Sequence, residues 1–276
     1  MDSDSIFQVN VREILRSKAP AIYKKIPGIV VRLLAKIICQ NQLNAILREN
    51  ASLSLTGVPF LENMLHIFDT RLQVHGIENL PPADRRCIFA SNHPLGGMDG
   101  ACLSVILGKH YEGRIRYLVN DVLYFVEPLQ DIFVPINKYG AQAKTAVSLL
   151  HEAFNSDNQI ITFPSGICSR KTKGIIRDPQ WRKMFISKAI EYQRDVVPVY
   201  FEAKNSNFFY RLANIRTALR IKFNIEMLFL PREMLKKRKA VMSVYFGKPI
   251  PWKTFDSSKT LQQWAKEIEN KVYNRS

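Results

Sequence analysis

The hydrophobic pattern begins with an aliphatic stripe near the N-terminus, in which large side chains recur at spacings of three and four residues. This spacing places them on one face of a helix that starts near Pro27. The members of the stripe are Ile26, Ile29, Val30, Leu33, Leu34, Ile37 and Ile38. Arg32 and Lys36 lie on its flank. The pattern is typical of a helix in a membrane interface, and it also fits a helix packed on the rest of the protein. Both interpretations stay open.

After Leu61 the pattern changes to short β-rich runs separated by helical windows. The predicted strands are Leu72–Ile77, Cys87–Ser91, Ile115–Asn120, Ile132–Ile136, Gln159–Phe163, Val196–Phe201, Ile225–Leu230 and Val241–Phe246. The predicted helical stripes are Ala143, Ala146, Val147, Leu150 and Phe154, and then Leu261, Trp264, Ile268 and Val272. The alternation predicts an α/β fold, with a sheet flanked by helices. We assign this domain to residues 66–276 and an amphipathic helical segment, placed at a membrane interface, to residues 1–65.

Composition narrows the protein classes further. The chain has 276 residues and is 46% hydrophobic, which supports a buried core and excludes disorder as its main state. No run of 18 uncharged apolar residues is present and the first residues are acidic and polar, so we expect neither a spanning helix nor a secretory signal. The cysteines lie far apart and fit reduced cytosolic thiols rather than a zinc or redox centre.

The charge balance predicts an anionic partner. Forty Lys and Arg residues against 24 Asp and Glu give a net charge of +16, which attracts nucleic acid, an acidic protein or a membrane surface. From Val11 to Arg48, eight basic residues accompany one acidic residue. Phe208–Arg211 interleaves aromatic rings with positive charge, as a nucleic-acid surface does. A non-enzymatic basic protein that binds nucleic acid or membrane is therefore one hypothesis.

The segment Ser91–Gly100 follows a buried-looking strand and carries the clearest candidate chemistry. Gly96 and Gly97 permit a tight turn that approaches a ligand closely. Asp99 stands near the start of the next helix, where its carboxylate either caps the helix or holds one ring nitrogen of His93. In the second case the other nitrogen is a general base, as in the serine proteases, and the substrate supplies the nucleophile.

This segment resembles the first motif of the glycerolipid acyltransferases, in which Asn-His is followed by an Asp. Phe133–Lys138 is similar to the second motif, with Lys138 in its basic position. Phe163–Ser169 is similar to the third motif, Phe-Pro-Glu-Gly-Thr-Arg-Ser, and Val197–Val199 to the fourth, a Val-Pro-Val strand. The four motifs occur in order over residues 85–200, and the resemblance therefore implies the fold and the reaction class of that family.

Three departures from the family pattern concern the acceptor. Five residues rather than four separate His93 from Asp99, so the glycine turn has to bring the Asp into register. Ser165 replaces the usual Glu, and Cys168 stands where the family has an Arg associated with acceptor phosphate. These features look more like the bacterial lyso-ornithine and lyso-glycine lipid O-acyltransferases, the hemolysin-like branch. The carboxylate of such an acceptor is expected to bind Arg170 or Lys171.

The resemblance implies that His93 takes a proton from an acceptor hydroxyl, which attacks an acyl thioester, while Asp99 supports the imidazolium. The implied substrate-binding residues are Asn92, Gly96, Gly97, Lys138, Phe163, Pro164, Ser165, Gly166, Ser169, Arg170 and Lys171. Within this set, the amides of Gly96 and Gly97, with Lys138, are expected on the oxyanion side. No metal and no cofactor are expected.

The implied partners are an acyl carrier protein or coenzyme A thioester, a lyso-lipid acceptor and an anionic membrane surface, without nucleic acid. The implied location is peripheral, on the cytoplasmic face of the inner membrane. A lysophosphatidic acid acyltransferase remains the alternative. An esterase with Ser165 as nucleophile is a further hypothesis, although the sequence lacks Gly-x-Ser-x-Gly.

Overall fold

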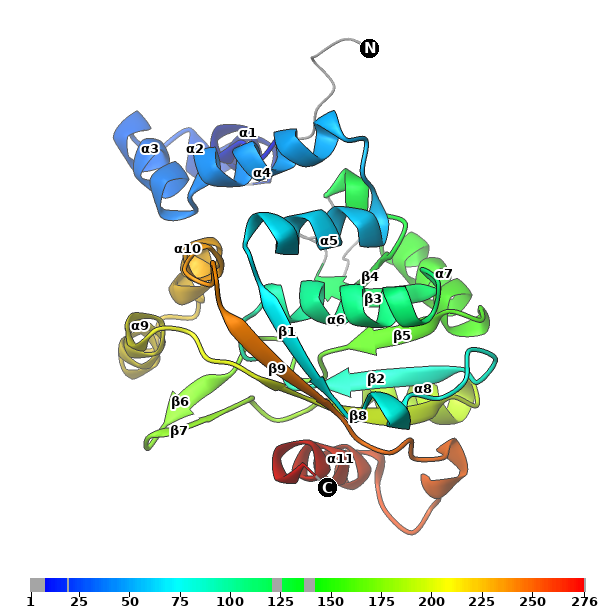
Figure 1. Ribbon diagram of the computed structural model, residues 1–276. Helices are drawn as coiled ribbons and strands as arrows, with labels where there is room; N and C mark the ends of the chain where they lie inside the picture. Colours follow the sequence, from blue (N-terminus) through cyan, green and yellow to red (C-terminus); the bar gives the residue numbers. More distant parts are fainter. Residues whose placement is uncertain (1–7, 19, 121–125, 137–141, 276) are drawn as a thin grey trace. The chain divides into compact units, whose positions relative to one another are not determined.

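The computed structural model describes residues 8–18, 20–120, 126–136 and 142–275 (Figure 1). The chain divides into two compact units. We call residues 1–55 and 205–238 the helical unit, and residues 56–204 and 239–276 the sheet unit. The division differs from the boundary predicted after residue 65, because helix α5 (Gly57–Ile67) packs on helix α6 (Met98–His110) of the sheet unit. It also joins residues 205–238, from the last third of the chain, to the N-terminal helices.

The N-terminal part of the helical unit consists of α1 (Val11–Lys18), α2 (Pro20–Tyr23), α3 (Gly28–Ile37) and α4 (Gln40–Ser52). The predicted helix is therefore present as α3, directly after Pro27. It ends before Cys39, whose φ of 54° lies in the left-handed region. Ile29 and Leu33 are 67% and 56% exposed, whereas Val31 is buried. The aliphatic stripe thus faces solvent for part of its length.

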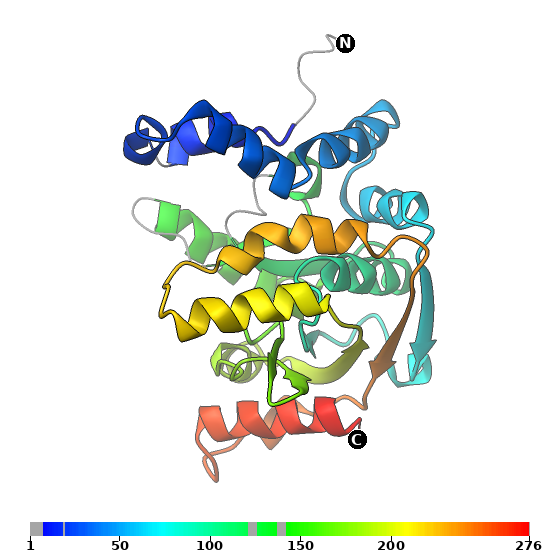
Figure 2. The same cartoon turned by 90° about the vertical axis from the view of Figure 1, so that its left-hand side faces the viewer.

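The second part of the helical unit is Asn205–Arg238, which contains α9 (Asn207–Ala218), the 3-10 helix η5 (Ile225–Phe229) and α10 (Leu230–Leu235). In Figure 2, α9 and α10 lie side by side. The strand predicted at Ile225–Leu230 is wrong, because this short apolar run forms η5 and the start of α10. Length and periodicity alone do not distinguish a buried strand from a buried helical turn. Pro231, in the first turn of α10, favours the helical alternative.

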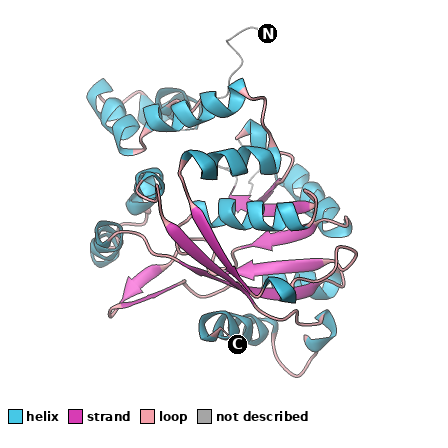
Figure 3. Cartoon of the chain, in the orientation of Figure 1, coloured by secondary structure: helices cyan, strands magenta, loops and turns pink. Residues whose placement is uncertain are grey.

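The sheet unit contains a seven-stranded sheet in the order β1-β9-β8-β2-β5-β3-β4 (Figure 3). The strands are β1 (Arg71–His75), β2 (Cys87–Ser91), β3 (Ile115–Asn120), β4 (Phe133–Ile136), β5 (Gln159–Thr162), β8 (Asp195–Glu202) and β9 (Val241–Phe246). Every neighbouring pair is parallel except β8 and β9. The predicted α/β fold, with a mostly parallel sheet flanked by helices, is confirmed.

Helices cover both faces of this sheet (Figure 1). On one face, α7 (Gln142–Asn155), α8 (Met184–Glu191) and α11 (Leu261–Asn274) contribute Phe154, Trp181, Phe185 and Trp264 to one hydrophobic cluster, with Trp181 just before α8. On the other face, α6 contacts β3 and β5, and α5 packs against α6. Strand β2 lies between these layers and is buried along its whole length. Ser91, the last residue of β2, is therefore fixed by neighbouring strands and by packing on both faces of the sheet.

Both predicted helical stripes in the sheet unit are present, as α7 and α11. In α7 the stripe is not uniformly buried, since Val147 is 66% exposed. In α11 the core positions Trp264, Ile268 and Val272 are all buried. Within the described ranges, no helix combines the length and apolarity needed to cross a membrane.

The contact between α5 and α6 requires a glycine at position 108. A Cβ added to Gly108 would lie 2.5 Å from Cγ2 of Val58, a stiff branched side chain. We expect Gly108→Ala to lower the free energy of unfolding by about 1–3 kcal/mol, because overpacking outweighs the gain in helix propensity. Denaturant unfolding measures this change. Adding Val58→Ala to the variant should restore part of the lost stability, and a Gly108→Ala protein as stable as the wild type would contradict the prediction.

Candidate active site

The site forms where two neighbouring parallel strands end. The chain leaves β2 at Ser91 and β5 at Thr162, and these carboxyl ends lie at the same edge of the sheet. His93 follows β2 and Phe163 follows β5, and their ring centroids lie 4.1 Å apart. The buried apolar ring thereby covers the imidazole. The side chain of His93 retains 12% of its exposure.

The two side chains predicted to form a pair do meet. Nδ1 of His93 lies 3.0 Å from Oδ2 of Asp99, and Asp99 is fully buried in the first turn of α6. The turn before α6 accommodates the additional residue between them, with Gly96 at a φ of 81°, in the left-handed region. Gly100 allows β3 to come close, because a Cβ there would lie 2.3 Å from the hydroxyl oxygen of Tyr117.

The amides of the glycine turn serve Asp99. The N–H groups of Leu95, Gly96, Gly97 and Gly100 donate to its two carboxylate oxygens over 2.9–3.3 Å. Both N–H groups of Gly96 and Gly97 are therefore already directed at a carboxylate. To donate to an oxyanion, as predicted, they would have to leave or share these hydrogen bonds. The other predicted oxyanion residue, Lys138, lies outside the described residues.

The electrostatics of the pair are reciprocal. Burial alone raises the pKa of Asp99, but the charge and hydrogen bond of His93 and the amides of Leu95 and Gly100 outweigh it and lower this pKa below its usual value. Burial alone lowers the pKa of His93, but the charge and hydrogen bond of Asp99, with a contribution from Asp178, raise it. The charge of Arg170 acts in the opposite direction on the pKa of His93. Asp99 is therefore the carboxylate partner of a basic imidazole.

Asp178 is a second carboxylate at the site, and no motif of the sequence predicts it. Both of its oxygens lie 3.1 Å from the backbone N of His93, which donates to them. The hydroxyl of Ser169 donates to Oδ1 over 2.5 Å and Nε1 of Trp181 donates to Oδ2 over 3.0 Å. Burial raises the pKa of Asp178, and the hydrogen bond from Ser169 partly offsets this. The carboxylate is 7% exposed, so it acts inside the protein.

A small hairpin brings Ser169 and Asp178 together. Strands β6 (Arg170–Thr172) and β7 (Ile175–Arg177) are antiparallel, with Arg170 opposite Arg177, so the residues that flank the hairpin face each other. Its two turn residues, Lys173 and Gly174, both have positive φ, as a tight β-hairpin requires. The Lys-Gly pair was the available signal for this turn. Nothing in the spacing of Asp178 connected it to His93.

The same region holds the backbone of His93 from its other side. The amide of Ser169 donates to the carbonyl oxygen of His93 over 2.8 Å. The His93 peptide is thus fixed through its N–H by Asp178 and through its C=O by Ser169. Since the ring is also held by Asp99, the position and the orientation of the imidazole are both determined by the fold.

Asn92 forms hydrogen bonds that hold two strands of the sheet together. Its side-chain amide donates to the carbonyl of Phe201 over 3.0 Å and accepts from the N–H of Phe201 over 2.6 Å. Asn92 is 3% exposed. It therefore extends the pairing of β2 with β8 beyond Ser91, and its polar atoms are engaged by backbone rather than directed at a substrate.

Of the predicted third-motif residues, Phe163 and Ser169 contact His93, and the chain between them forms a turn. Ser165 is buried, and its hydroxyl donates to the carbonyl of Ile167 over 2.9 Å. The carbonyl of Pro164 accepts from the N–H of Arg182, and the exposed Gly166 has a φ of 71°. This segment is a tight turn whose polar groups mainly bond to one another.

Arg170 and Lys171 are half-buried on β6. Nη1 of Arg170 donates to the carbonyl of Cys168 over 2.7 Å and lies 3.2 Å from its Sγ. Burial raises the pKa of the Cys168 thiol to about 11, despite the opposing charge of Arg170. The guanidinium therefore stands beside the site with part of its donor capacity used by the turn.

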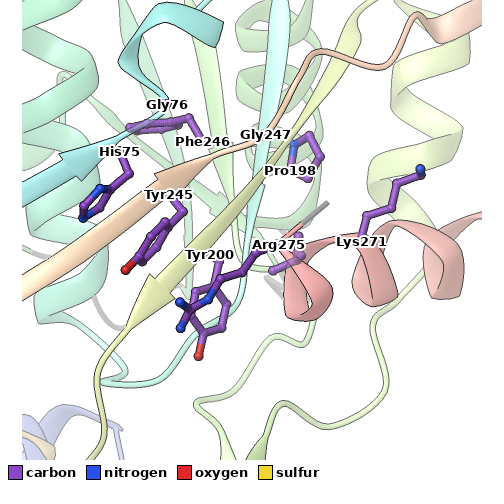
Figure 4. Close-up of a pocket in the computed structure, with 10 residues that line it drawn as sticks. His75, Gly76, Pro198, Tyr200, Tyr245, Phe246, Gly247, Lys271 and Arg275 are labelled. Carbon is purple, nitrogen blue, oxygen red and sulfur yellow. The ribbon is translucent and has the colours of Figure 1, made fainter.

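A pocket lies on the face of the sheet that α11 covers (Figure 4). Tyr200, Tyr245 and Arg275 contribute to its lining. The guanidinium of Arg275 lies 4.7 and 4.6 Å from the centroids of the two tyrosine rings and pairs with Glu202 at 3.0 Å. These groups thus bind one another. On the neighbouring part of α11, the hydroxyl oxygen of Tyr273 accepts from the N–H of Asp178 over 2.7 Å.

In the described part of the chain, no group of three or more His, Cys, Asp or Glu side chains is arranged to hold a metal ion. The arrangement that is present is an Asp-held imidazole at the end of a central strand. With Nδ1–H directed at Asp99, Nε2 of a neutral His93 is able to accept a proton. Fold and site together are those of an α/β enzyme with a histidine suited to proton exchange with a substrate.

The chain belongs to the acyltransferase family, whose family model matches residues 13–275. A lyso-glycine lipid O-acyltransferase of Bacteroides thetaiotaomicron is 51% identical to it over 273 residues, which cover 99% of both chains. A protein of the same name from Phocaeicola vulgatus is 49% identical over 273 residues, covering 99% of this chain and 97% of the relative. The protein is therefore an acyltransferase, as the motifs predicted.

The chain is also similar to a solved structure. The 1-acyl-sn-glycerophosphate acyltransferase PlsC of Thermotoga maritima aligns with a TM-score of 0.47 and 19% sequence identity. The alignment covers 79% of this chain and 77% of the PlsC chain.

The second carboxylate gives a test of the site. We expect Asp178→Asn to lower the pKa of His93, because a negative charge that stabilises the imidazolium is removed. The acid limb of the pH profile of acyl transfer should therefore move to lower pH. We also expect kcat to fall by about tenfold, since an amide cannot accept from His93, Ser169 and Trp181 together.

Asp195→Asn is the matched control. Asp195 is also a buried carboxylate, but it lies at the opposite end of β8, where it pairs with Arg85 and accepts from the N–H of Trp252. This variant should lose stability and keep the acid limb of the wild type. If Asp178→Asn also keeps that limb, Asp178 does not act on the imidazole.

Proposed function

We propose that the protein transfers a fatty acyl group from an acyl thioester to the hydroxyl of a lyso-glycine lipid. Two relatives of that name, 51% and 49% identical over nearly the full chain, support this acceptor. The observation that carries the proposal is the buried His93–Asp99 pair, which supplies a base and leaves the nucleophile to the substrate.

In the proposed reaction, Nε2 of His93 accepts the proton of the acceptor hydroxyl while the hydroxyl oxygen attacks the thioester carbonyl. The new C–O bond forms as the C–S bond breaks, and the departing thiolate takes the proton from the imidazolium. Asp99 stabilises the imidazolium in the interval. General base catalysis of this type supplies about 10²- to 10⁴-fold, and positioning by the fixed His93 peptide adds to it.

The charges near the site fit an acceptor that carries a carboxylate. Arg170 is close enough to His93 to influence its pKa, and Lys171 is its neighbour on β6. In our proposal one of these two cations, Arg170 or Lys171, binds the glycine carboxylate of the acceptor, because neighbouring residues of a strand point to opposite faces. The donor, acyl carrier protein or a coenzyme A thioester, is acidic, and the net charge of +16 favours its approach.

We also propose that the protein binds the membrane peripherally, on the cytoplasmic face of the inner membrane. Support comes from α3, where Ile29, Val30 and Leu33 are exposed beside the exposed Arg32 and Lys36. An exposed aliphatic face flanked by cations suits an interfacial helix.

The geometry does not favour hydrolysis by Ser165. Its hydroxyl is buried and donates to the carbonyl of Ile167, whereas a nucleophilic serine donates to its base. No second function is therefore proposed.

The acceptor is tested by mass spectrometry of lipids after incubation with acyl donors and lyso-glycine lipid, lyso-ornithine lipid or lysophosphatidate. We expect lyso-glycine lipid to gain an acyl chain fastest. His93→Ala should reduce the rate by at least about 10²-fold, because the base is lost. Ser165→Ala should retain transfer. Wild-type turnover in His93→Ala, or preferential acylation of lysophosphatidate, would contradict the proposal.

The membrane role of α3 is tested by replacing Ile29, Val30 and Leu33 with Ser. We expect weaker flotation with anionic vesicles, because the apolar area available for insertion is reduced. Val147→Ser, at a similarly exposed apolar position in α7, is the control and should float as the wild type does. Unchanged flotation of the triple variant would exclude α3 as the membrane contact.

A further inference from the structure

Helix α9 carries two apolar faces rather than one. Phe209 and Ala213 point into the protein and are 0% and 1% exposed. The second face is an outward stripe in which residues follow one another at spacings of four, three and four: Phe208, Leu212, Ile215 and Leu219. Because this spacing matches the helical repeat, the four side chains form a line along α9. Ile215 and Leu219 are 57% and 66% exposed.

The loop after α9 continues the outward stripe. Ile221 and Phe223 follow it and are 37% and 62% exposed. The loop is fixed to the helix by Arg216, whose Nε bonds to Oε2 of Glu226 at 3.0 Å and whose Nη1 donates to the carbonyl of Ile221 over 3.1 Å. The exposed apolar side chains of Ile221 and Phe223 therefore lie on a loop that is held to α9 by hydrogen bonds.

A second buried glutamate holds the N-terminal end of α9 in place through hydrogen bonds. Both oxygens of Glu233, on α10, accept from Ser206, the N-cap residue of α9, over 2.7 and 2.8 Å. Lys236 pairs with the same carboxylate at 2.6 Å. Glu226 and Glu233 are 0% and 1% exposed, and they are the acidic residues of Asn205–Arg238. Both carboxylates thus form hydrogen bonds and ion pairs inside the protein.

The charge that this segment presents outward is positive. Asn205–Arg238 contains eight basic residues. Three of them, Arg211, Arg220 and Lys222, are exposed beside or just after the outward stripe. Large exposed apolar side chains in a row, flanked by cations and held on a rigid frame, match an anionic lipid surface, which offers apolar tails beneath negative headgroups.

We propose that the outward stripe of α9, with Ile221 and Phe223, is a second membrane-binding surface that inserts into the headgroup region of an anionic bilayer. A second copy of this chain is a poor occupant, since two such basic surfaces repel each other. An acidic carrier protein would satisfy the cations but not the row of large apolar groups. This surface deepens the proposed function, because it brings the enzyme to the phase in which a lyso-lipid acceptor resides.

The test uses the full chain and vesicles of phosphatidylcholine with and without phosphatidylglycerol. We expect Ile215→Ser/Leu219→Ser/Phe223→Ser to weaken binding to the phosphatidylglycerol vesicles by at least about tenfold, since three inserting side chains are lost. Arg211→Gln/Arg220→Gln/Lys222→Gln should remove most of the preference for phosphatidylglycerol. The matched control Val147→Ser/Ile175→Ser/Val241→Ser, at exposed apolar positions of the sheet unit, should bind as the wild type does.

Circular dichroism establishes that each variant is folded, and Phe223→Trp supplies a direct reporter, whose emission should shift to shorter wavelength on the anionic vesicles. Transfer to an acceptor dispersed in detergent should be the same in the wild type and the α9 triple variant. If the wild type itself does not acylate the acceptor in detergent, the result contradicts the proposed function and not the membrane-binding surface. Unchanged vesicle binding by the folded triple variant, or weakened binding only to acidic carrier protein, overturns the surface.

Discussion

The contact between His93 and Asp99 is the constraint on which the rest of the site depends. A fully buried carboxylate is stable only when its charge is compensated, and Asp99 receives four backbone N–H groups in addition to the imidazole. Three of those amides come from the turn between β2 and α6, and the fourth, of Gly100, from the first turn of α6. The turn has its positive φ at Gly96, where a glycine is favoured. The turn therefore stabilises the charge of Asp99, and Asp99 in turn fixes the ring of His93.

A second set of interactions fixes the backbone of the same histidine. Asp178 and Ser169, at the two ends of a small hairpin, hold its N–H and C=O. One imidazole thus lies in the field of two carboxylates, Asp99 on the ring and Asp178 near the peptide, with Arg170 opposing both. The third motif of this chain carries Ser165 rather than an acid, and the second carboxylate near His93 is Asp178, nine residues beyond Ser169.

The sequence was most informative where the local pattern decides the structure. The buried run Cys87–Ser91 and the turn after it predicted both a strand and the His–Asp pair. It was least informative where partners far along the chain decide. Asp178, for example, reaches His93 across 85 residues of sequence. The run Ile225–Leu230 was ambiguous for a different reason, because its length and composition fit a strand as well as the helical turn that it forms. The sequence also does not show that the N–H groups of Gly96 and Gly97 point at Asp99, because backbone direction is set by the folded turn.

The net positive charge of the protein is distributed unevenly between the two units. The helical unit has 16 basic and six acidic residues, so 89 residues carry +10 of the net +16. Two of those acids, Glu226 and Glu233, are buried in ion pairs with Arg216 and Lys236, so the other basic residues of Asn205–Arg238 face no acidic residue of that segment that is itself exposed. The sheet unit holds the buried carboxylates that a proton-accepting histidine requires. The carboxylates that support the imidazolium are thus buried inside the sheet unit, whereas the basic surfaces proposed to meet lipid headgroups belong to the helical unit.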